Sequence, residues 1–186
     1  MINYLTRNKI KQKIKGNNSK IIRGGQCVFR ETIISIDGDN NVVKFGDRCN
    51  LSGLNIYIYG NNNSIIFGND VIVNASRRQP TVMNALDGTS ITIGDRALFS
   101  NNIEIHTTDY HKIYDEHGNQ LNHPRDIVIG EHVWIGLGVK ILKGTFIAKN
   151  CVVGAGSVLS GKYETPNVVL AGNPLRIIKE DISWSY

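Results

Sequence analysis

Residues 129–158 repeat one pattern every six residues: Ile129-Gly-Glu-His-Val-Trp, Ile135-Gly-Leu-Gly-Val-Lys, Ile141-Leu-Lys-Gly-Thr-Phe, Ile147-Ala-Lys-Asn-Cys-Val and Val153-Gly-Ala-Gly-Ser-Val. An aliphatic residue opens each unit, and a small or short residue follows four places later. A helix repeats about every 3.6 residues and a strand about every two, so neither produces this period. The pattern predicts a coil with flat sides, each side one short strand, whose stacked rungs bury a continuous core.

The same phase continues towards the N-terminus with interruptions. Its inward positions fall on Ile93, Phe99 and Ile105, on Phe67 and Val73, on Phe45, Leu51 and Tyr57, and more weakly on Ile21, Cys27 and Ile33. Asp39 breaks the phase, and a Gly60-Asn-Asn-Asn63 run between Tyr57 and Phe67 predicts a turn bulging from one corner. We therefore expect an all-β chain, with a β-helix over residues 21–178, a leader at 1–20 and a tail at 179–186.

Two longer segments interrupt the repeat. The phase is lost between Val73 and Ile93, across Arg77-Arg-Gln-Pro80, and again between Ile105 and Ile129. The second segment is rich in His, Asp, Asn and Tyr. Long insertions in a compact repeat domain are usually functional or disordered, and this composition favours a functional loop protruding at residues 106–126.

Length and composition are typical of one domain, with 186 residues of which 41% are hydrophobic and 20% charged. No apolar run approaches the roughly 18 residues of a membrane span, and the N-terminus lacks the apolar core of a signal peptide, so we expect a cytoplasmic protein. Two of the three cysteines, Cys49 and Cys151, take the inward fourth position of a repeat. We interpret both as reduced core residues with no metal or disulfide role.

The net charge of +5 is concentrated near the N-terminus. Residues 1–30 hold eight basic side chains and no acid, which leaves 13 bases against 16 acids, a net charge of −3, in the rest of the chain. Residues 4–14 could form a basic helix lying on an anionic membrane surface, and the alternative is a solvated leader. No aromatic platform is interleaved with these charges, so nucleic-acid binding is not expected.

Three segments, together with the hexapeptides, resemble a known family: Ile127-Val-Ile-Gly-Glu-His-Val-Trp-Ile-Gly136, Val153-Gly-Ala-Gly-Ser-Val158 and Ala171-Gly-Asn-Pro174. They look like the left-handed β-helix acyltransferases, and most like the sugar O-acetyltransferase branch, which includes galactoside, maltose, nodulation, capsule and lipopolysaccharide enzymes. The resemblance covers roughly residues 40–178. It implies a left-handed coil and a homotrimer with acetyl-CoA bound in clefts between neighbouring coils.

Acetyl transfer to a sugar hydroxyl needs a base, because a free alcohol is a poor nucleophile near neutral pH, and histidine is the side chain best suited to that role. The candidates are His106, His111, His117, His123 and His132. The resemblance implies that the base lies in the loop after Ile105, where His111 matches an Asp-x-His motif. Counted without gaps, the family position falls one residue earlier, at Tyr110. His106 is the alternative base, and Asp109 could orient the loop or the imidazole.

The resemblance also implies residues that bind the two substrates. Asn74 matches an acceptor-binding asparagine, although it could equally satisfy a coil corner. Trp134 matches an aromatic residue beside acetyl-CoA and the acceptor, and Arg77 with the residues 107–126 is expected to shape the acceptor pocket. The groove for the cofactor is implied at Gly136, Gly154, Ala155, Gly156, Ala171 and Gly172, while Lys162 and Arg176 match bases that pair with its phosphates.

The sequence therefore predicts an acetyl-CoA-dependent sugar O-acetyltransferase without a required metal. It would act by direct transfer on a cell-surface polysaccharide or its precursor, at the inner face of the membrane. Three alternatives stay open. One is N-acetylation of an amino-sugar nucleotide, and another is a non-catalytic trimeric scaffold. The third is a γ-class carbonic anhydrase, which would need a zinc-binding histidine before His106, where the sequence has none.

Overall fold

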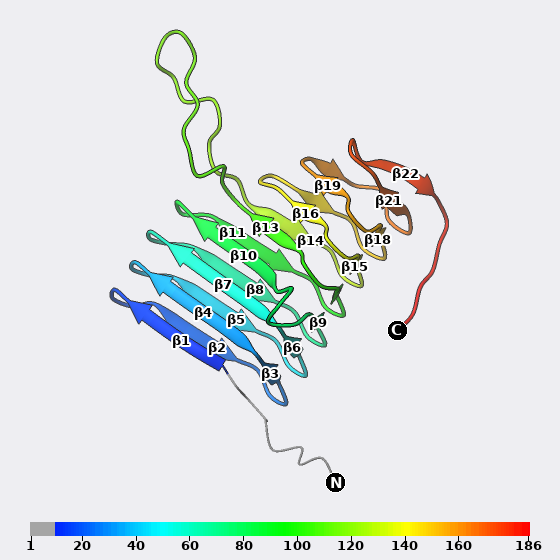
Figure 1. Ribbon diagram of the computed structural model, residues 1–186, viewed down its shortest axis with the longest axis horizontal. Helices are drawn as coiled ribbons and strands as arrows, with labels where there is room; N and C mark the ends of the chain where they lie inside the picture. Colours follow the sequence, from blue (N-terminus) through cyan, green and yellow to red (C-terminus); the bar gives the residue numbers. More distant parts are fainter. Residues whose placement is uncertain (1–9) are drawn as a thin grey trace.

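The computed structural model describes residues 10–186, which form parallel strands wound into a coil with three flat faces (Figure 1). No helix occurs within these residues. Successive strands go to sheet A, then B, then C, so each turn of the coil adds one strand to every sheet.

Sheet A consists of β1 (Ile10–Lys15), β4 (Thr32–Asp37), β7 (Leu54–Tyr59), β10 (Thr81–Leu86), β13 (Glu104–His106), β16 (Lys140–Ile141) and β19 (Val158–Leu159). Sheet B consists of β2 (Lys20–Arg23), β5 (Val42–Phe45), β8 (Ser64–Phe67), β11 (Ser90–Ile93), β14 (Ile127–Ile129), β17 (Phe146–Ile147) and β20 (Lys162–Tyr163). Sheet C consists of β3 (Val28–Arg30), β6 (Asn50–Ser52), β9 (Ile72–Asn74), β12 (Leu98–Phe99), β15 (Trp134–Ile135), β18 (Val152–Val153), β21 (Val169–Ala171) and the antiparallel β22 (Arg176–Lys179).

The length of one turn changes along the coil. In the late rungs Lys140 pairs with Val158, a turn of 18 residues, as three hexapeptides require. In the early rungs Lys11 pairs with Ile33, a turn of 22 residues. The extra residues lengthen the strands of sheet A to six residues and widen the corner that follows them. This second period explains why the hexapeptide phase breaks at Asp39 and steps by ten residues after Tyr57.

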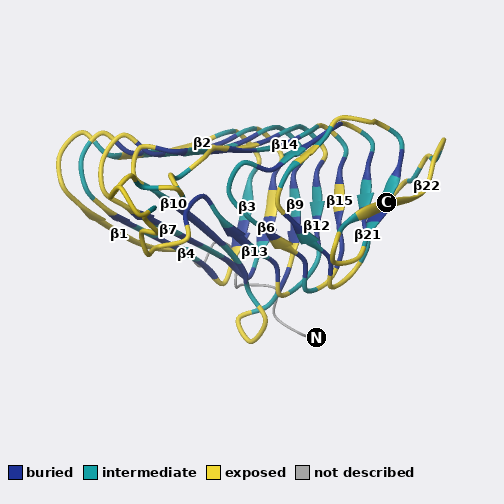
Figure 2. Cartoon of the chain, turned by 90° about the horizontal axis from the view of Figure 1, so that it is seen from above, coloured by how far each residue is buried: buried dark blue, intermediate teal, exposed yellow. Residues whose placement is uncertain are grey.

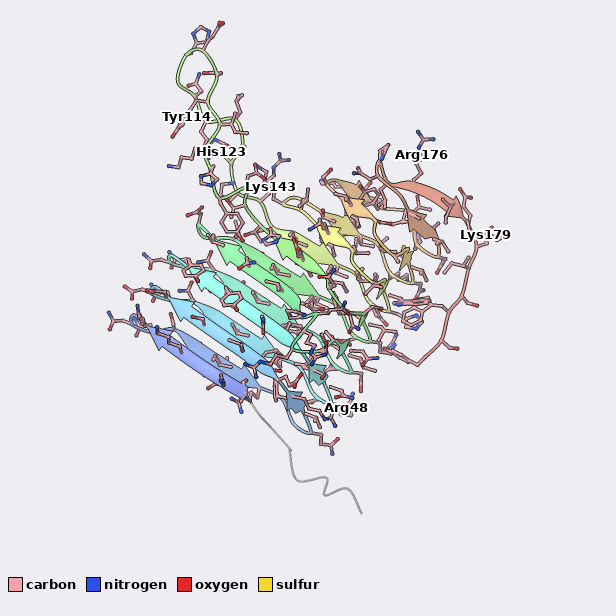
Figure 3. All side chains as sticks on the ribbon, in the orientation of Figure 1. Arg48, Tyr114, His123, Lys143, Arg176 and Lys179 are labelled. Atoms are coloured by element: carbon pink, nitrogen blue, oxygen red, sulfur yellow. The ribbon has the colours of Figure 1, made fainter. Side chains whose placement is uncertain are left out.

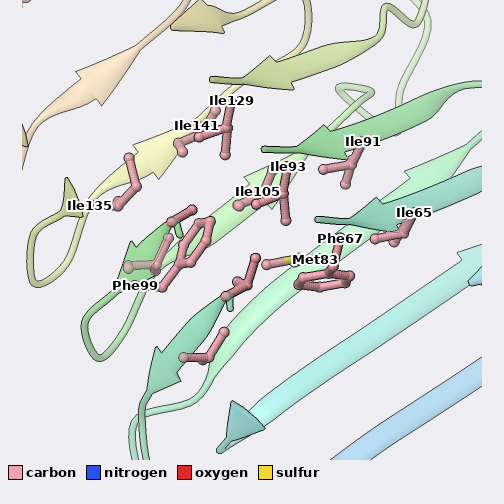
Figure 4. Packing of buried hydrophobic residues seen from close by; sticks show 14 of the residues in the cluster. Ile65, Phe67, Met83, Ile91, Ile93, Phe99, Ile105, Ile129, Ile135 and Ile141 are labelled. Carbon is pink, nitrogen blue, oxygen red and sulfur yellow. The ribbon is translucent and has the colours of Figure 1, made fainter. Parts of the chain in front are cut away.

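The core is a column of apolar side chains enclosed by the three sheets. Figure 2 shows buried residues alternating with partly exposed ones along the strands, and Figure 4 shows Phe67, Met83 and Phe99 packed among isoleucines. The rings of Phe45 and Phe67 stack with centroids 4.8 Å apart. Cys49 and Cys151 are buried in this column, as predicted, and burial raises the pKa of the Cys49 thiol to about 12.

The predicted leader is wrong for residues 10–20. Strand β1 pairs with β4 along its whole length, and Lys20 pairs with Val42, so this segment belongs to the coil. The basic helix, one of the two alternatives for residues 4–14, is likewise replaced by strand from Ile10 onwards. The reason is the turn of 22 residues, which adds one more rung to the coil. The basic residues of β1 take the outward positions of this rung. The rest of both predictions, residues 1–9, lies outside the described residues.

The C-terminal tail folds back onto the coil. The amide of Ile182 donates to the carbonyl of Asn167, the Trp184 ring stacks on the His132 ring with centroids 4.1 Å apart, and the Tyr186 hydroxyl donates to the carbonyl of Arg96. These three anchors lie at the corners that precede β21, β15 and β12 of sheet C, so the tail runs along the outside of the coil (Figure 1). No helix suited to crossing a membrane is found among residues 10–186.

Candidate active site

The loop at residues 107–126 leaves the coil at the corner between sheets A and B and projects away from it (Figure 1). Its two limbs meet at an isolated bridge between Tyr114 and Gln120. At the tip the Asp115 carboxylate accepts hydrogen bonds from the amides of His117 and Asn119. The loop therefore has its own hydrogen-bonded structure, which can hold a side chain in a fixed place.

The base of the loop is held by Asp109. Its Oδ2 lies 2.5 Å from Lys143 Nζ and accepts a hydrogen bond from Asn122 Nδ2 at 2.8 Å. The same Asn122 nitrogen donates to the His111 carbonyl at 2.7 Å. Lys143, near the loop base in Figure 3, and Asn122 together hold the pKa of Asp109 below its usual range. Within residues 10–186 Asp109 makes no contact with the His111 ring, so it fixes the backbone around His111 and does not orient the imidazole directly.

His106 stands in a closed polar cluster on the outer face of sheet A. Its Nδ1 lies 2.7 Å from the Tyr110 hydroxyl and 3.1 Å from Asn84 Nδ2, and its Nε2 lies 3.6 Å from Glu104 Oε2. Glu104 in turn accepts a hydrogen bond from Lys140 at 2.8 Å. Burial is the main cause that lowers the pKa of His106, so the ring is neutral near pH 7. Both of its nitrogens therefore face protein groups.

His111 has the opposite environment. It is exposed, and its ring has no hydrogen-bond or ion-pair partner in the part of the chain that the structure describes. His117 and His123 are exposed further along the loop, with His123 labelled in Figure 3, and His132 is covered by the Trp184 ring. His111 is therefore the histidine of the loop base that is free to meet a substrate.

Residues assigned to acetyl-CoA gather on the outer face of sheet C and its corner with sheet A. Trp134 is 39% exposed on β15, and Gly136 is buried at the corner that follows this strand. The paired strands place Gly154 and Ala171 on the neighbouring rungs, because Trp134 pairs with Val152 and Val152 with Val169. A Cβ on Gly136 would lie 2.7 Å from the Val153 oxygen and one on Gly154 3.0 Å from Ala171 Cβ. The close stacking of neighbouring rungs therefore favours glycine at both positions, independently of any bound cofactor.

The remaining predicted residues divide between two places. Asn74 ends β9 on sheet C, two rungs before Gly136, and Arg77 lies in the insertion that follows, where its amide donates to Glu31 Oε2. Ala155 and Gly172 lie beside Gly154 and Ala171, and Arg176 opens β22 (Figure 3). Lys162, however, begins β20 on sheet B, above Phe146 and on the side of the coil where the loop emerges.

One chain therefore carries two half-sites. The loop half-site consists of Asp109, His111 and Lys162 at the corner of sheets A and B. The groove half-site lies on sheet C and its corner with sheet A, and it consists of Asn74, Arg77, Trp134, Gly136, Gly154, Ala155, Ala171, Gly172 and Arg176. Sheet B separates His111 from Trp134, since β14 lies between the loop and β15. The two half-sites thus lie on different faces of one chain.

No family model matches the chain. It is 40% identical over 97 residues to the galactoside O-acetyltransferase of Escherichia coli K12, and 34% identical over 95 residues to a polysialic acid O-acetyltransferase of Neisseria meningitidis. These matches cover 51% and 50% of this chain and 46% and 44% of the relatives. The solved structure of the polysialic acid O-acetyltransferase OatWY aligns with a TM-score of 0.73 and 29% identity, over 96% of this chain and 92% of that one. The chain is similar to sugar O-acetyltransferases, in sequence over about half of its length and in fold over nearly all of it.

This similarity agrees with the fold predicted from the sequence. A second solved structure, of the polysialic acid-specific acetyltransferase NeuO, aligns with a TM-score of 0.70 at 23% identity, and it shares the left-handed β-helix. The predicted fold class is thus confirmed. The chain spans about half the length of the curated relatives it matches.

Sequence reasoning missed the residues that support the site. Lys143 and Asn122 lie 34 and 13 residues from Asp109, and no periodicity links them. The cluster around His106 could have been found by register, because a 22-residue turn pairs Asn84 with His106 on adjacent strands. Among residues 10–186, no group of three or more His, Cys, Asp or Glu side chains is arranged to hold a metal ion.

Proposed function

We propose that the protein is an acetyl-CoA-dependent O-acetyltransferase acting on a sugar hydroxyl. The observation that carries the proposal is the contrast between the two loop-base histidines. His106 is enclosed and neutral with both nitrogens facing protein groups, whereas the His111 ring is exposed on a loop base fixed by Asp109, Asn122 and Lys143. A general base needs a free nitrogen on a rigid support, and His111 fulfils both conditions.

The proposed reaction is a direct transfer. The His111 imidazole takes the proton of the sugar hydroxyl while the hydroxyl oxygen bonds to the carbonyl carbon of the acetyl thioester. The tetrahedral intermediate breaks its carbon–sulfur bond, and the departing CoA thiolate takes the proton from the imidazolium. A backbone N–H of the opposing coil would stabilise the oxyanion. Cys49 and Cys151 are buried with thiol pKa values raised by burial, which disfavours a cysteine nucleophile and an acyl-enzyme.

The two half-sites support a homotrimer with active sites between subunits. The loop half-site of one chain would supply the base, and the groove half-site of its neighbour would hold acetyl-CoA against Trp134, with Arg176 and Lys162 near its phosphates. Relatives named for galactosides and polysialic acid support a glycan acceptor, here a cell-surface polysaccharide or its precursor. A cytoplasmic location and membrane contact through the basic N-terminus stay predictions of the sequence.

The variant His111→Ala tests the base directly. We expect acetyl transfer to sugar acceptors to fall by at least 100-fold, a loss typical of removing a general base, with acetyl-CoA affinity by calorimetric titration unchanged. His117→Ala, an exposed histidine of the same loop, is the matched control and should retain wild-type turnover. Full activity of His111→Ala would refute the assignment. Acceptors that differ only by an amine in place of a hydroxyl separate O-transfer from N-transfer.

A further inference from the structure

We propose that Tyr110 is a positioning residue. Its hydroxyl is hydrogen-bonded to the His106 ring, and this bond holds the turn that orients His111 towards the acceptor. This inference rests on the proposed acetyl transfer and adds to it a second pair of residues, Tyr110 and His106, that act through the base. The polar cluster around His106 on the outer face of sheet A has no direct part in the proposed reaction, yet it contacts the loop through Tyr110.

The hydrogen bonds of the cluster fix the protonation of the His106 ring. Asn84 presents its amide nitrogen, which can only donate, so His106 Nδ1 must accept. The Tyr110 hydroxyl, 2.7 Å from the same Nδ1, therefore donates as well. The ring proton stays on Nε2, which faces the Glu104 carboxylate at 3.6 Å, and Lys140 holds that carboxylate. His106 is thus a fixed acceptor for the Tyr110 hydroxyl.

Tyr110 also has a strained backbone. Its φ is 64°, a value in the left-handed region that a bulky residue adopts rarely. The amide of His111 donates to the carbonyl of Asp109 at 2.7 Å, which closes a three-residue turn centred on Tyr110. With a positive φ at its centre, this is the rarer and more strained form of the γ-turn. Such conformations persist only where surrounding contacts hold them, and they cluster at functional sites.

Contacts on both sides of Tyr110 hold this turn. On one side Lys143 holds the Asp109 carboxylate, and Asn122 donates to the same carboxylate and to the His111 carbonyl. On the other side the Tyr110 hydroxyl makes a side-chain hydrogen bond to His106, which links the turn to strand β13. Since His111 follows Tyr110 directly, relaxing the turn would rotate the base away from its place. A displacement of about 1 Å is enough to slow a reaction by about 100-fold.

The variant Tyr110→Phe removes the hydroxyl and keeps the ring. We expect kcat to fall by about 10- to 100-fold while the KM for acetyl-CoA and the acceptor changes by less than about threefold, since positioning acts on the transition state. Tyr59→Phe is the matched control, because Tyr59 is an exposed tyrosine of sheet A that lies outside the loop, and it should behave as wild type. An unchanged kcat in Tyr110→Phe would overturn the inference, as would a loss of equal size in Tyr59→Phe.

A second measurement does not depend on turnover. Nitrogen-15 NMR of the wild-type imidazoles near pH 7 should show His106 with a protonated Nε2 and an unprotonated Nδ1 that accepts a hydrogen bond, and the Nδ1 signal should move in Tyr110→Phe. A protonated Nδ1, or signals identical in the two proteins, would overturn the inference. If the signals behave as expected but the wild-type protein transfers acetyl to no hydroxyl acceptor, the proposed function fails while the hydrogen bond stands.

Discussion

At the scale of single residues, the chemistry of this chain depends on surroundings more than on residue type. His106 and His111 are five positions apart, yet one is enclosed with both nitrogens facing protein groups and the other is exposed with a free ring. The sequence could identify the loop and favour His111 through the family motif, but it could not show why His106 is excluded. That reason lies in Asn84, which the register of paired strands places beside His106, and in Glu104, which lies two residues before His106 on the same strand.

Asp109 gives a prediction that depends on pH. Lys143 and Asn122 lower the pKa of Asp109 in the folded loop, so between this lowered pKa and the ordinary value of 3.8 the folded loop holds fewer protons than the opened one. The stabilisation is therefore present above the ordinary value and lost as the pH falls through the lowered pKa. We expect pepsin to cleave residues 107–126 with a rate that rises steeply as the pH drops below about 4.

The variant Lys143→Met should shift this opening to higher pH, because it removes the largest cause of the lowered pKa of Asp109. Lys149→Met, an exposed lysine on the same coil, is the matched control and should keep the wild-type profile. A cleavage profile of Lys143→Met that coincides with that of the wild type would show that Lys143 does not hold the loop.

At the scale of elements, the tail at residues 180–186 contributes more than the sequence suggested. It was predicted as a tail outside the coil, because its residues carry no repeat. In the structure the Trp184 ring covers His132, its Nε1 donates to the His132 carbonyl at 3.0 Å, and it lies 6.0 Å from the Trp134 ring. The tail therefore connects rungs of the coil through its contacts and lies beside the Trp134 ring.

Removing the Trp184 side chain tests this fastening. Trp184→Ala loses a stacked ring pair and a hydrogen bond, so we expect the free energy of unfolding to fall by about 2 kcal/mol. Denaturant unfolding followed by circular dichroism measures the change, and Ser183→Ala, a neighbouring exposed position, should leave the midpoint in place. Equal midpoints for Trp184→Ala and wild type would mean that the tail lies on the coil without stabilising it.

At the scale of the whole molecule, the late rungs were predictable and the early ones only in part. Residues 129–158 fix an 18-residue turn, because each hexapeptide supplies one side of the coil. The first rungs follow a 22-residue turn whose longer strands no hexapeptide count can detect, so the coil was predicted to begin at residue 21 although it includes Ile10. The division of the site residues into two half-sites could not be predicted for a different reason. It depends on which sheet each strand joins, and the sequence pattern does not show this.

Mixing of subunits tests whether the loop half-site of one subunit works with the groove half-site of another. His111→Ala and Trp134→Ala should each be inactive as pure proteins, because one lacks the base and the other the aromatic residue of the groove. Unfolded together in equal amounts and refolded, they should recover about a quarter of wild-type activity, since about one interface in four then joins an intact loop half-site to an intact groove half-site. If both half-sites served the reaction within one chain, the mixture would stay as inactive as its components, and that result would contradict the account.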